Sequence, residues 1–215
     1  DRVIKTGSPM FEVLHYYMNK IQASKIRRQL KLKEKDYFVV SCHREENVDD
    51  EDNFRGLIAV LKGLSKTYHK RIIMTTHPRM RKRIEQKNIK LPSLVELHKP
   101  FSFSDYVHLQ MHSQTVLSDS GTITEESSIL NFPALNIRQA HERPEGMEEG
   151  SVAMVGMCWT RIQEALAVLN VQPRGNKRLL NIVADYDVTN VSEKVVRIIL
   201  SYTDYVHQTV WRKQV

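Results

Sequence analysis

Short apolar runs alternate with amphipathic stretches along most of the chain. The apolar runs lie at residues 38–42, 71–76, 94–97, 115–117, 134–137 and 153–155, and each has the length of a buried strand. Apolar residues recur at helical spacing in the intervening stretches 51–68, 79–89, 105–112 and 122–130, and again in 160–169. Strands separated by helices in this rhythm predict an α/β fold with a doubly wound, Rossmann-like parallel sheet.

The two ends of the chain depart from this rhythm. Residues 3–7 begin like a strand that runs into a turn, and helices are predicted at 10–21 and, with a basic surface, at 24–30. The tail from 191 to 211 predicts a long helix with a broad apolar face, although no strand remains for it to cover. We therefore expect a Rossmann-like domain over residues 1–190 and a separate terminal helix over 191–215.

Charge and hydropathy limit the classes of partner. The formal charge of +7 favours an anionic partner, either a nucleic acid or a nucleotide diphosphate. The basic residues of 79–83 lack interleaved aromatic residues and are typical of a solvated helix face, which argues against nucleic acid. No apolar run approaches the ~20 residues that cross a bilayer, and the first residues lack a signal-peptide pattern. We expect a cytoplasmic protein without a membrane partner.

The cysteines give no sign of a disulfide or a metal site. Cys42 and Cys158 are far apart in the sequence, and neither has a Cys or His neighbour at metal-ligand spacing. Both are predicted to be buried, reduced thiols.

Residues 115–126 predict a strand, a tight polar turn and the start of a helix. Ser120 offers a hydroxyl, Gly121 lets the backbone approach a ligand closely, and the helix presents the positive end of its dipole. A phosphate group suits such a turn. Thr122 and Glu125 also have the spacing of a capping box, which needs no ligand and is an equally physical explanation of this stretch.

Two further residues favour a nucleotide over a simple helix cap. Glu126 projects about 100 degrees around the helix from Glu125, where it could accept hydrogen bonds from a ribose diol. Arg143, in the turn 141–146 that follows the next predicted strand, supplies a cation near the same rim. Farther upstream, His43 and Arg44 come directly after a predicted strand, where open α/β sheets place their ligands.

These motifs together resemble the carboxyl-terminal half of the non-hydrolysing UDP-N-acetylglucosamine 2-epimerases. The family's Asp-Ser-Gly-Gly-x-x-Glu-Glu run is matched at 119–126, with Thr122 in place of the second glycine, and its Glu-Arg-Pro-Glu at 142–145. A short strand ending in Val-Gly follows at 152–156. The family's His-Arg-Arg-Glu-Asn appears at 43–47 with Glu45 in place of the second arginine, and its His-Pro turn at 77–78.

The resemblance implies a role for each matched residue. His43 is the candidate catalytic residue and would reach the pyrophosphate or the sugar. Phe101 and Tyr106 stand where the family holds the uracil ring. The full set of implied UDP-binding residues is Arg44, Phe101, Tyr106, Ser120, Gly121, Thr122, Glu126 and Arg143. Glu46 and His77 match positions at which some bacterial members hold a second substrate molecule as an effector.

The resemblance also implies a fold and a chemistry. The domain would be one half of a two-domain GT-B-like nucleotide-sugar fold, and its terminal helix would cross back to an amino-terminal domain. The reaction would eliminate UDP across C1 and C2 of the sugar and add it again with inverted C2, without a cofactor or a metal. The acidic residues that move the C2 proton belong to the family's amino-terminal domain, so we expect the 215-residue chain alone to be inactive. The resemblance also implies that the full-length protein is a homodimer.

Two points stay open at the level of sequence. The sequence of residues 135–146 most resembles that of the family branch that acts on UDP-N-acetyl 6-deoxy or uronic sugars in capsule and O-antigen synthesis. This branch includes the enzymes that form UDP-N-acetyl-L-fucosamine. The alternative function is the donor-binding domain of a GT-B glycosyltransferase, which ends its strands in similar turns. A basic nucleic-acid-binding module is the third class.

Overall fold

A six-stranded parallel sheet forms the centre of the protein. The computed structural model describes residues 3–44, 47, 49–140 and 142–213. Its strands, in the spatial order β3-β2-β1-β4-β5-β6, are β1 (Tyr37–Ser41), β2 (Arg71–Thr75), β3 (Val95–His98), β4 (Val116–Ser118), β5 (Ala134–Asn136) and β6 (Ala153–Met154). The strand order reverses between β1 and β4, which pair in parallel, so the predicted doubly wound sheet is confirmed.

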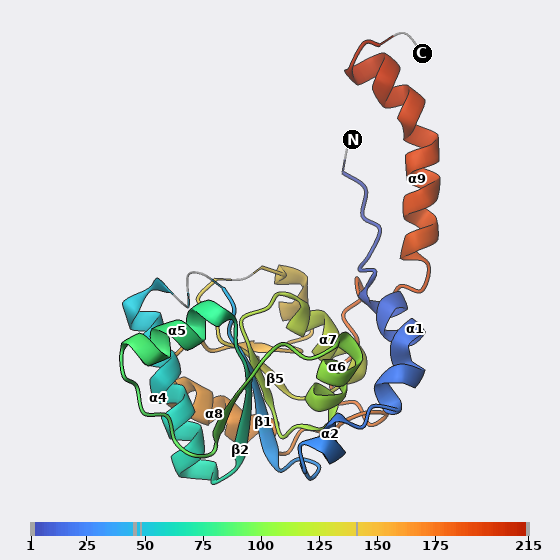
Figure 1. Ribbon diagram of the computed structural model, residues 1–215. Coiled ribbons are helices and arrows are strands. Elements are labelled where there is room, and N and C mark those ends of the chain that lie inside the picture. Colours follow the sequence, from blue (N-terminus) through green and yellow to red (C-terminus); the bar gives the residue numbers. More distant parts are fainter. Residues whose placement is uncertain (1–2, 45–46, 48, 141, 214–215) are drawn as a thin grey trace.

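Helices cover both faces of the sheet (Figure 1). One face carries α4 (Glu51–Tyr68), α5 (Pro78–Gln86) and α8 (Trp159–Leu169). The other carries α1 (Met10–Gln22), α2 (Ile26–Gln29), α6 (Phe103–His112) and α7 (Thr122–Leu130). The short 3-10 helix η1 (Pro144–Met147) follows β5, and the chain ends in α9 (Val191–Tyr205) and the π-helical turn η2 (Val206–Val210).

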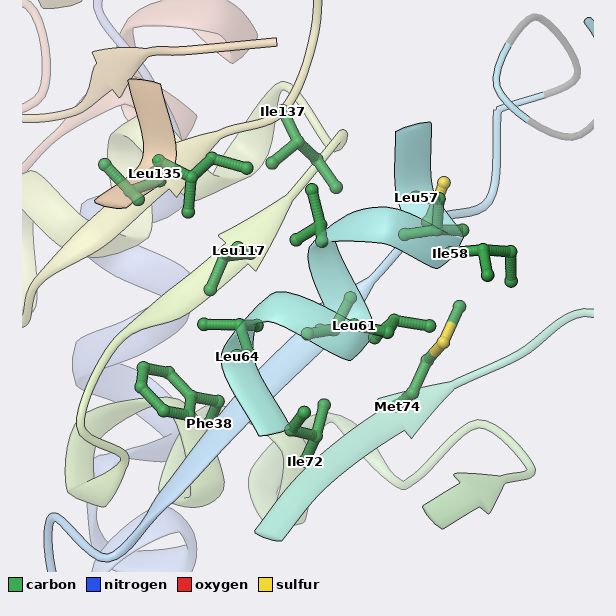
Figure 2. Packing of buried hydrophobic residues seen from close by; sticks show 14 of the residues in the cluster. Phe38, Leu57, Ile58, Leu61, Leu64, Ile72, Met74, Leu117, Leu135 and Ile137 are labelled. Carbon is green, nitrogen blue, oxygen red and sulfur yellow. The ribbon is translucent and has the colours of Figure 1, made fainter. Parts of the chain in front are cut away.

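The strands are buried on both sides, and their alternating side chains divide between two cores. Phe38 and Val40 of β1 point toward α4, whereas Tyr37 and Val39 face α6 and α7. Figure 2 shows the first of these cores, where Leu57, Leu61 and Leu64 of α4 lie over the strands. Continuous burial on both faces explains why β1 is almost wholly apolar and does not alternate with polar residues.

Local signals set the helix limits. The Asp50 side chain accepts from the Asn53 backbone N–H at 2.8 Å and begins α4, and His69 ends it in the left-handed conformation with φ 51°. The predicted helix 79–89 ends earlier, at Gln86, because Asn88 adopts φ 49° and turns the chain. The predicted basic helix 24–30 is a single turn, α2.

The strand predicted at residues 3–7 is wrong. Residues 3–7 have no regular secondary structure, and the side chain of Val3 is 95% exposed. Gly7 has φ +91° and the Ser8 N–H donates to the Asp185 carbonyl at 2.8 Å, so this segment is attached to the loop before α9 and not to a sheet edge. Two apolar residues in a row were too weak a signal for a strand.

Helix α9 extends away from the sheet domain, and the amino-terminal segment runs beside it (Figure 1). A groove of about 710 Å³ lies between Ile4 and the α9–η2 residues Ile198, Tyr202 and Val206. Much of the apolar face that the sequence predicted is exposed, with Ile199 at 58% and Tyr205 at 52%. Among the described residues, no helix is long and apolar enough to cross a membrane.

Candidate functional site

A pocket of about 280 Å³ opens at the carboxyl ends of β1 and β4, where the strand order reverses. Open α/β sheets bind ligands at this switch point. The lining residues come from four strand ends or loops and from two helices: Ser41, His43, Thr75, Pro100, Phe101, Phe103, Tyr106, Gln110, Ser118, Ser120, Thr122 and Glu126. Six of these were predicted from the sequence, namely His43, Phe101, Tyr106, Ser120, Thr122 and Glu126.

Aromatic side chains form one wall of the pocket. Phe101, Phe103 and Tyr106 come from the loop after β3 and the first turns of α6. Burial raises the pKa of the Tyr106 hydroxyl well above its ordinary value, and the neighbouring polar groups of Ser41 and Gln110 only partly offset this rise. It therefore remains a neutral group at physiological pH, beside rings that offer flat faces to a planar ligand.

Another part of the lining is the turn that precedes α7. Ser120 Oγ accepts from the Thr122 backbone N–H at 3.3 Å and lies 2.9 Å from Thr122 Oγ1. The helix begins at Thr122 with Gly121 as its N-cap, and no side chain caps it from that position. The capping box of Thr122 and Glu125 is thus wrong, because Thr122 is already the first helical residue and Glu125 lies one position too far along.

Glu125 and Glu126 point to different sides of α7, as their spacing predicts. Glu125 accepts a hydrogen bond from the Ser8 hydroxyl and forms an ion pair with Arg143, at 3.1 Å between Oε2 and Nε. Glu126 enters the pocket, where its Oε2 accepts from Gln110 Nε2 at 2.8 Å. Burial raises the pKa of Glu126 to about 7, since few charged partners compensate for the loss of water.

Asp119 organises the loop that carries His43. Its carboxylate accepts from the backbone N–H groups of His43 and Arg44 at 3.0 and 2.9 Å, and from Asn47 Nδ2 at 3.0 Å. Asp119 is only 1% exposed, so these bonds replace its water shell. Its role was not predicted from the sequence. Its place at the head of the Asp-Ser-Gly run was the available signal.

His43 follows β1 and also lines the pocket. Its Nε2 is 3.2 Å from Thr75 Oγ1. The ring keeps an exposed edge, yet the water it loses at the pocket lowers its pKa below the ordinary histidine value, and this effect exceeds the opposing attraction of Asp119. The imidazole is therefore neutral at pH 7 and can donate or accept one hydrogen bond at each nitrogen.

Three predicted binding residues, Arg44, Gly121 and Arg143, lie outside the pocket lining, and Gly121 and Arg143 line a separate small cavity. Arg143 lies against Gly121, since a Cβ on this glycine would be 2.1 Å from Arg143 Nη1. The Arg44 Nε donates to the Asp119 carbonyl at 3.1 Å, and its guanidinium also pairs with Glu142. The arginines thus converge on the turn before α7, where Glu125 and Glu142 hold them.

Comparison with known proteins identifies the fold and the family. The family model described as UDP-N-acetylglucosamine 2-epimerase matches residues 1–200 of this chain. The chain belongs to the UDP-N-acetylglucosamine 2-epimerase family. The structure of such an epimerase from Rickettsia bellii superposes with a TM-score of 0.89 at 46% identity, over 97% of this chain and 56% of that one. The GT-B-like Rossmann fold is therefore confirmed.

Two curated epimerases are similar in sequence. The protein from Methanocaldococcus jannaschii is 30% identical over 79% of this chain and 46% of its own length, and that from Neisseria meningitidis is 29% identical over 93% and 55%. A Neisseria meningitidis structure described as bound to UDP-GlcNAc superposes with a TM-score of 0.76 at 28% identity, over 94% of this chain and 56% of that one. This epimerase-family chain spans about half the length of the curated relatives it matches.

His77, a remaining predicted residue of this family member, is not part of the pocket lining. His77 is the N-cap of α5, where Nδ1 accepts from the Arg79 backbone N–H at 3.4 Å, so local capping accounts for it. Glu46 lies outside the described residues. The basic face of α5 is engaged with neighbouring carboxylates, for example Arg83 with Glu51 at 2.7 Å, as expected of a solvated surface.

The cysteines are only partly as predicted. Cys42 is buried, whereas Cys158 is exposed at the start of α8, which corrects the prediction of two buried thiols. In the described part of the chain, His, Cys, Asp and Glu side chains do not gather in threes that could hold a metal ion.

Proposed function

We propose that this chain is the UDP-binding half of a nucleotide-sugar C2 epimerase that acts in the cytoplasmic synthesis of capsule or O-antigen precursors. The observation that supports the proposal is the composition of the switch-point pocket. An aromatic wall, a helix amino terminus with a hydroxyl and a buried carboxylate surround the same space. These are the groups that a nucleobase, a diphosphate and a ribose require.

Each part of UDP has a proposed partner. The uracil ring stacks against Phe101 and Tyr106. The ribose diol donates to Glu126, whose carboxylate faces the pocket. The diphosphate lies at the amino terminus of α7, where Ser120 and Thr122 present hydroxyl groups, Gly121 lets the backbone approach closely and the helix dipole favours negative charge.

The arginines complete the anion site from the rim. Arg143 is held by Glu125, which fixes the guanidinium close to Gly121. Arg44 is fixed by the Asp119 carbonyl on the other side of the turn. Placing these cations beside the leaving diphosphate stabilises charge that grows as the C1–O bond breaks, and one preorganised donor of this kind can be worth ~10²-fold in rate.

His43 is the proposed catalytic residue of this half. A neutral imidazole can donate to an oxygen of the diphosphate while its other nitrogen contacts Thr75. In elimination the C1–O bond breaks, a proton leaves C2, and UDP departs from a glycal-type intermediate. UDP then adds again and C2 receives a proton on the other face, so no electrons are exchanged with a cofactor.

The proton-transfer groups are proposed to lie in an amino-terminal domain, since this chain spans about half of its relatives' length. Residues 1–190 would form the UDP-binding domain, and residues 191–215 would cross to the other domain. The exposed apolar face of α9 supports this arrangement, because Val196, Ile199 and Leu200 are each more than half exposed. The whole protein would be a homodimer.

The substrate is proposed to be a UDP-N-acetyl sugar. The Neisseria meningitidis structure is described as bound to UDP-GlcNAc. The sequence around Arg143 favours the branch that acts on 6-deoxy or uronic sugars. His77 and Glu46 would hold a second substrate molecule as an effector, and the His77 side chain also caps α5.

Hydrogen–deuterium exchange at C2 of UDP-N-acetyl sugars in D₂O tests this proposal. We expect exchange with the protein that contains both halves and none with these 215 residues, because positioned acid and base groups contribute ~10²- to 10⁴-fold each. No sugar acceptor is added, so a glycosyltransferase would give no exchange. Exchange by this chain alone would overturn the division between the two halves, and no exchange by the longer protein would overturn the epimerase assignment.

A further inference from the structure

Gln110 is a buried pocket residue with an unused hydrogen-bond acceptor. It lies in α6, is 1% exposed and lines the switch-point pocket. Its Nε2 donates to Glu126 Oε2 at 2.8 Å, whereas its Oε1 has no hydrogen-bond partner among the described residues. Buried polar atoms are nearly always paired, and an unpaired one in a ligand pocket calls for a donor from the ligand.

The position of Gln110 shows which part of the pocket it serves. Phe103, Tyr106 and Gln110 share one face of α6 at spacings of three and four residues, so they follow one another along the pocket wall. Phe103 is 38% exposed, whereas Gln110 and Glu126 are almost wholly buried. The amide and the carboxylate therefore form the deep, buried end of the pocket.

The chemistry of this deep end is that of two adjacent acceptors. The Gln110 amide N–H₂ is already used on Glu126, which leaves its carbonyl oxygen beside the remaining lone pairs of the carboxylate. A phosphate group, which only accepts at neutral pH, is repelled by such a pair. An imide offers one donor, whereas a vicinal diol offers two at neighbouring atoms.

We propose that Gln110 is a specificity-determining residue that accepts a hydrogen bond from one ribose hydroxyl while Glu126 accepts from the other. This inference rests on the proposed function, since it assigns the ribose of UDP to the deep end of the same pocket. Its consequence is selectivity for ribonucleotides, because an analogue without the hydroxyls leaves both acceptors buried and unpaired.

Calorimetric titration of Gln110→Met with UDP and with 2′,3′-dideoxy-UDP tests the assignment. Methionine keeps the length of the side chain and removes the amide. We expect the affinity for UDP to fall about tenfold and the affinity for the dideoxy analogue to remain within about twofold of wild type. Equal losses for both nucleotides would overturn the proposal and leave Gln110 a structural residue.

A matched control and a second variant keep this test interpretable. Gln114 is also a buried glutamine with an unpaired Oε1, but its Nε2 donates to Asn170 at 2.9 Å outside the pocket. Gln114→Met should therefore leave both affinities unchanged. If Gln110→Met does not fold, Gln110→Asn is the second variant, because it retains the amide on a side chain that is shorter by one methylene. The same selective loss of affinity for UDP is expected.

A double-mutant cycle separates direct contact from an effect through Glu126. In a Glu126→Gln background, Gln110→Met should still weaken UDP more than dideoxy-UDP, because its own hydrogen bond to the ribose is lost. If the selective loss disappears in that background, Gln110 only positions Glu126 and the direct contact is contradicted. If the wild-type chain binds neither nucleotide, this inference and the proposed function both fail, whereas equal losses in a UDP-binding chain reject the inference alone.

Discussion

Replacing Asp119 by alanine is expected to lower the free energy of unfolding by about 3 kcal/mol or more and to abolish measurable UDP binding. The carboxylate accepts from three donors in the loop after β1, which are the N–H groups of His43 and Arg44 and the amide of Asn47. Leaving a buried donor such as the Asn47 amide unpaired costs about 1 to 3 kcal/mol, and the two partly buried backbone N–H groups add to this loss. Without these bonds the loop loses its conformation, and His43 and Arg44 lose their places at the site.

Urea denaturation and calorimetry measure the two effects. Asp119→Asn retains one carbonyl oxygen and should lose less stability than the alanine variant. Asp204→Ala, at an exposed position of α9, should change neither quantity. If Asp119→Ala bound UDP with wild-type affinity, Asp119 would not organise the loop as we describe.

The stability of the wild-type chain is expected to fall as the pH rises from about 4.5 to above 7. Glu126 has a pKa near 7 in the folded protein against an ordinary value of 4.5, so the folded state holds its proton more tightly than the unfolded state. The stabilisation from this proton is complete below pH 4.5 and is lost as the pH rises through 7. A shift of this size corresponds to on the order of 3 kcal/mol.

Glu126→Gln removes this titration and tests the assignment. The variant should show a flatter dependence of the unfolding free energy on pH between 4.5 and 7.5, measured by urea denaturation at a series of pH values. Glu193→Gln, at an exposed position of α9, should retain the slope of the wild type. An unchanged slope in Glu126→Gln would mean that another group titrates in this range.

Much of the fold follows from short-range signals in the sequence. The alternation of buried runs and amphipathic helices located the six strands of the sheet, and the predicted limits of α4 and α7 agree with the structure. The errors arise where a local pattern was weak or had two explanations. Residues 3–7 lack the length of a strand, and the end of α5 depends on the left-handed conformation of Asn88, which composition does not reveal.

The site was predictable where residues follow a strand or begin a helix. His43, Ser120 and Thr122 could be placed in this way. Gln110 and Asp119 escaped because their roles depend on side-chain hydrogen bonds between distant elements. Gln110 donates a hydrogen bond to Glu126 of the next helix. Asp119, in the loop after β4, accepts one from His43, which lies 76 residues earlier in the sequence. Such pairings appear only once the sheet has assembled.

Mapping of UDP binding by backbone amide chemical shifts tests the central claim most directly. We expect the largest changes at Ser120, Gly121 and Thr122, at the amino terminus of α7, with further changes at His43 and along the Tyr106 face of α6. These residues surround the switch-point pocket or its rim. Saturable shifts confined to the basic face of α5, or no shifts at millimolar UDP, would contradict the assignment of this pocket to the nucleotide.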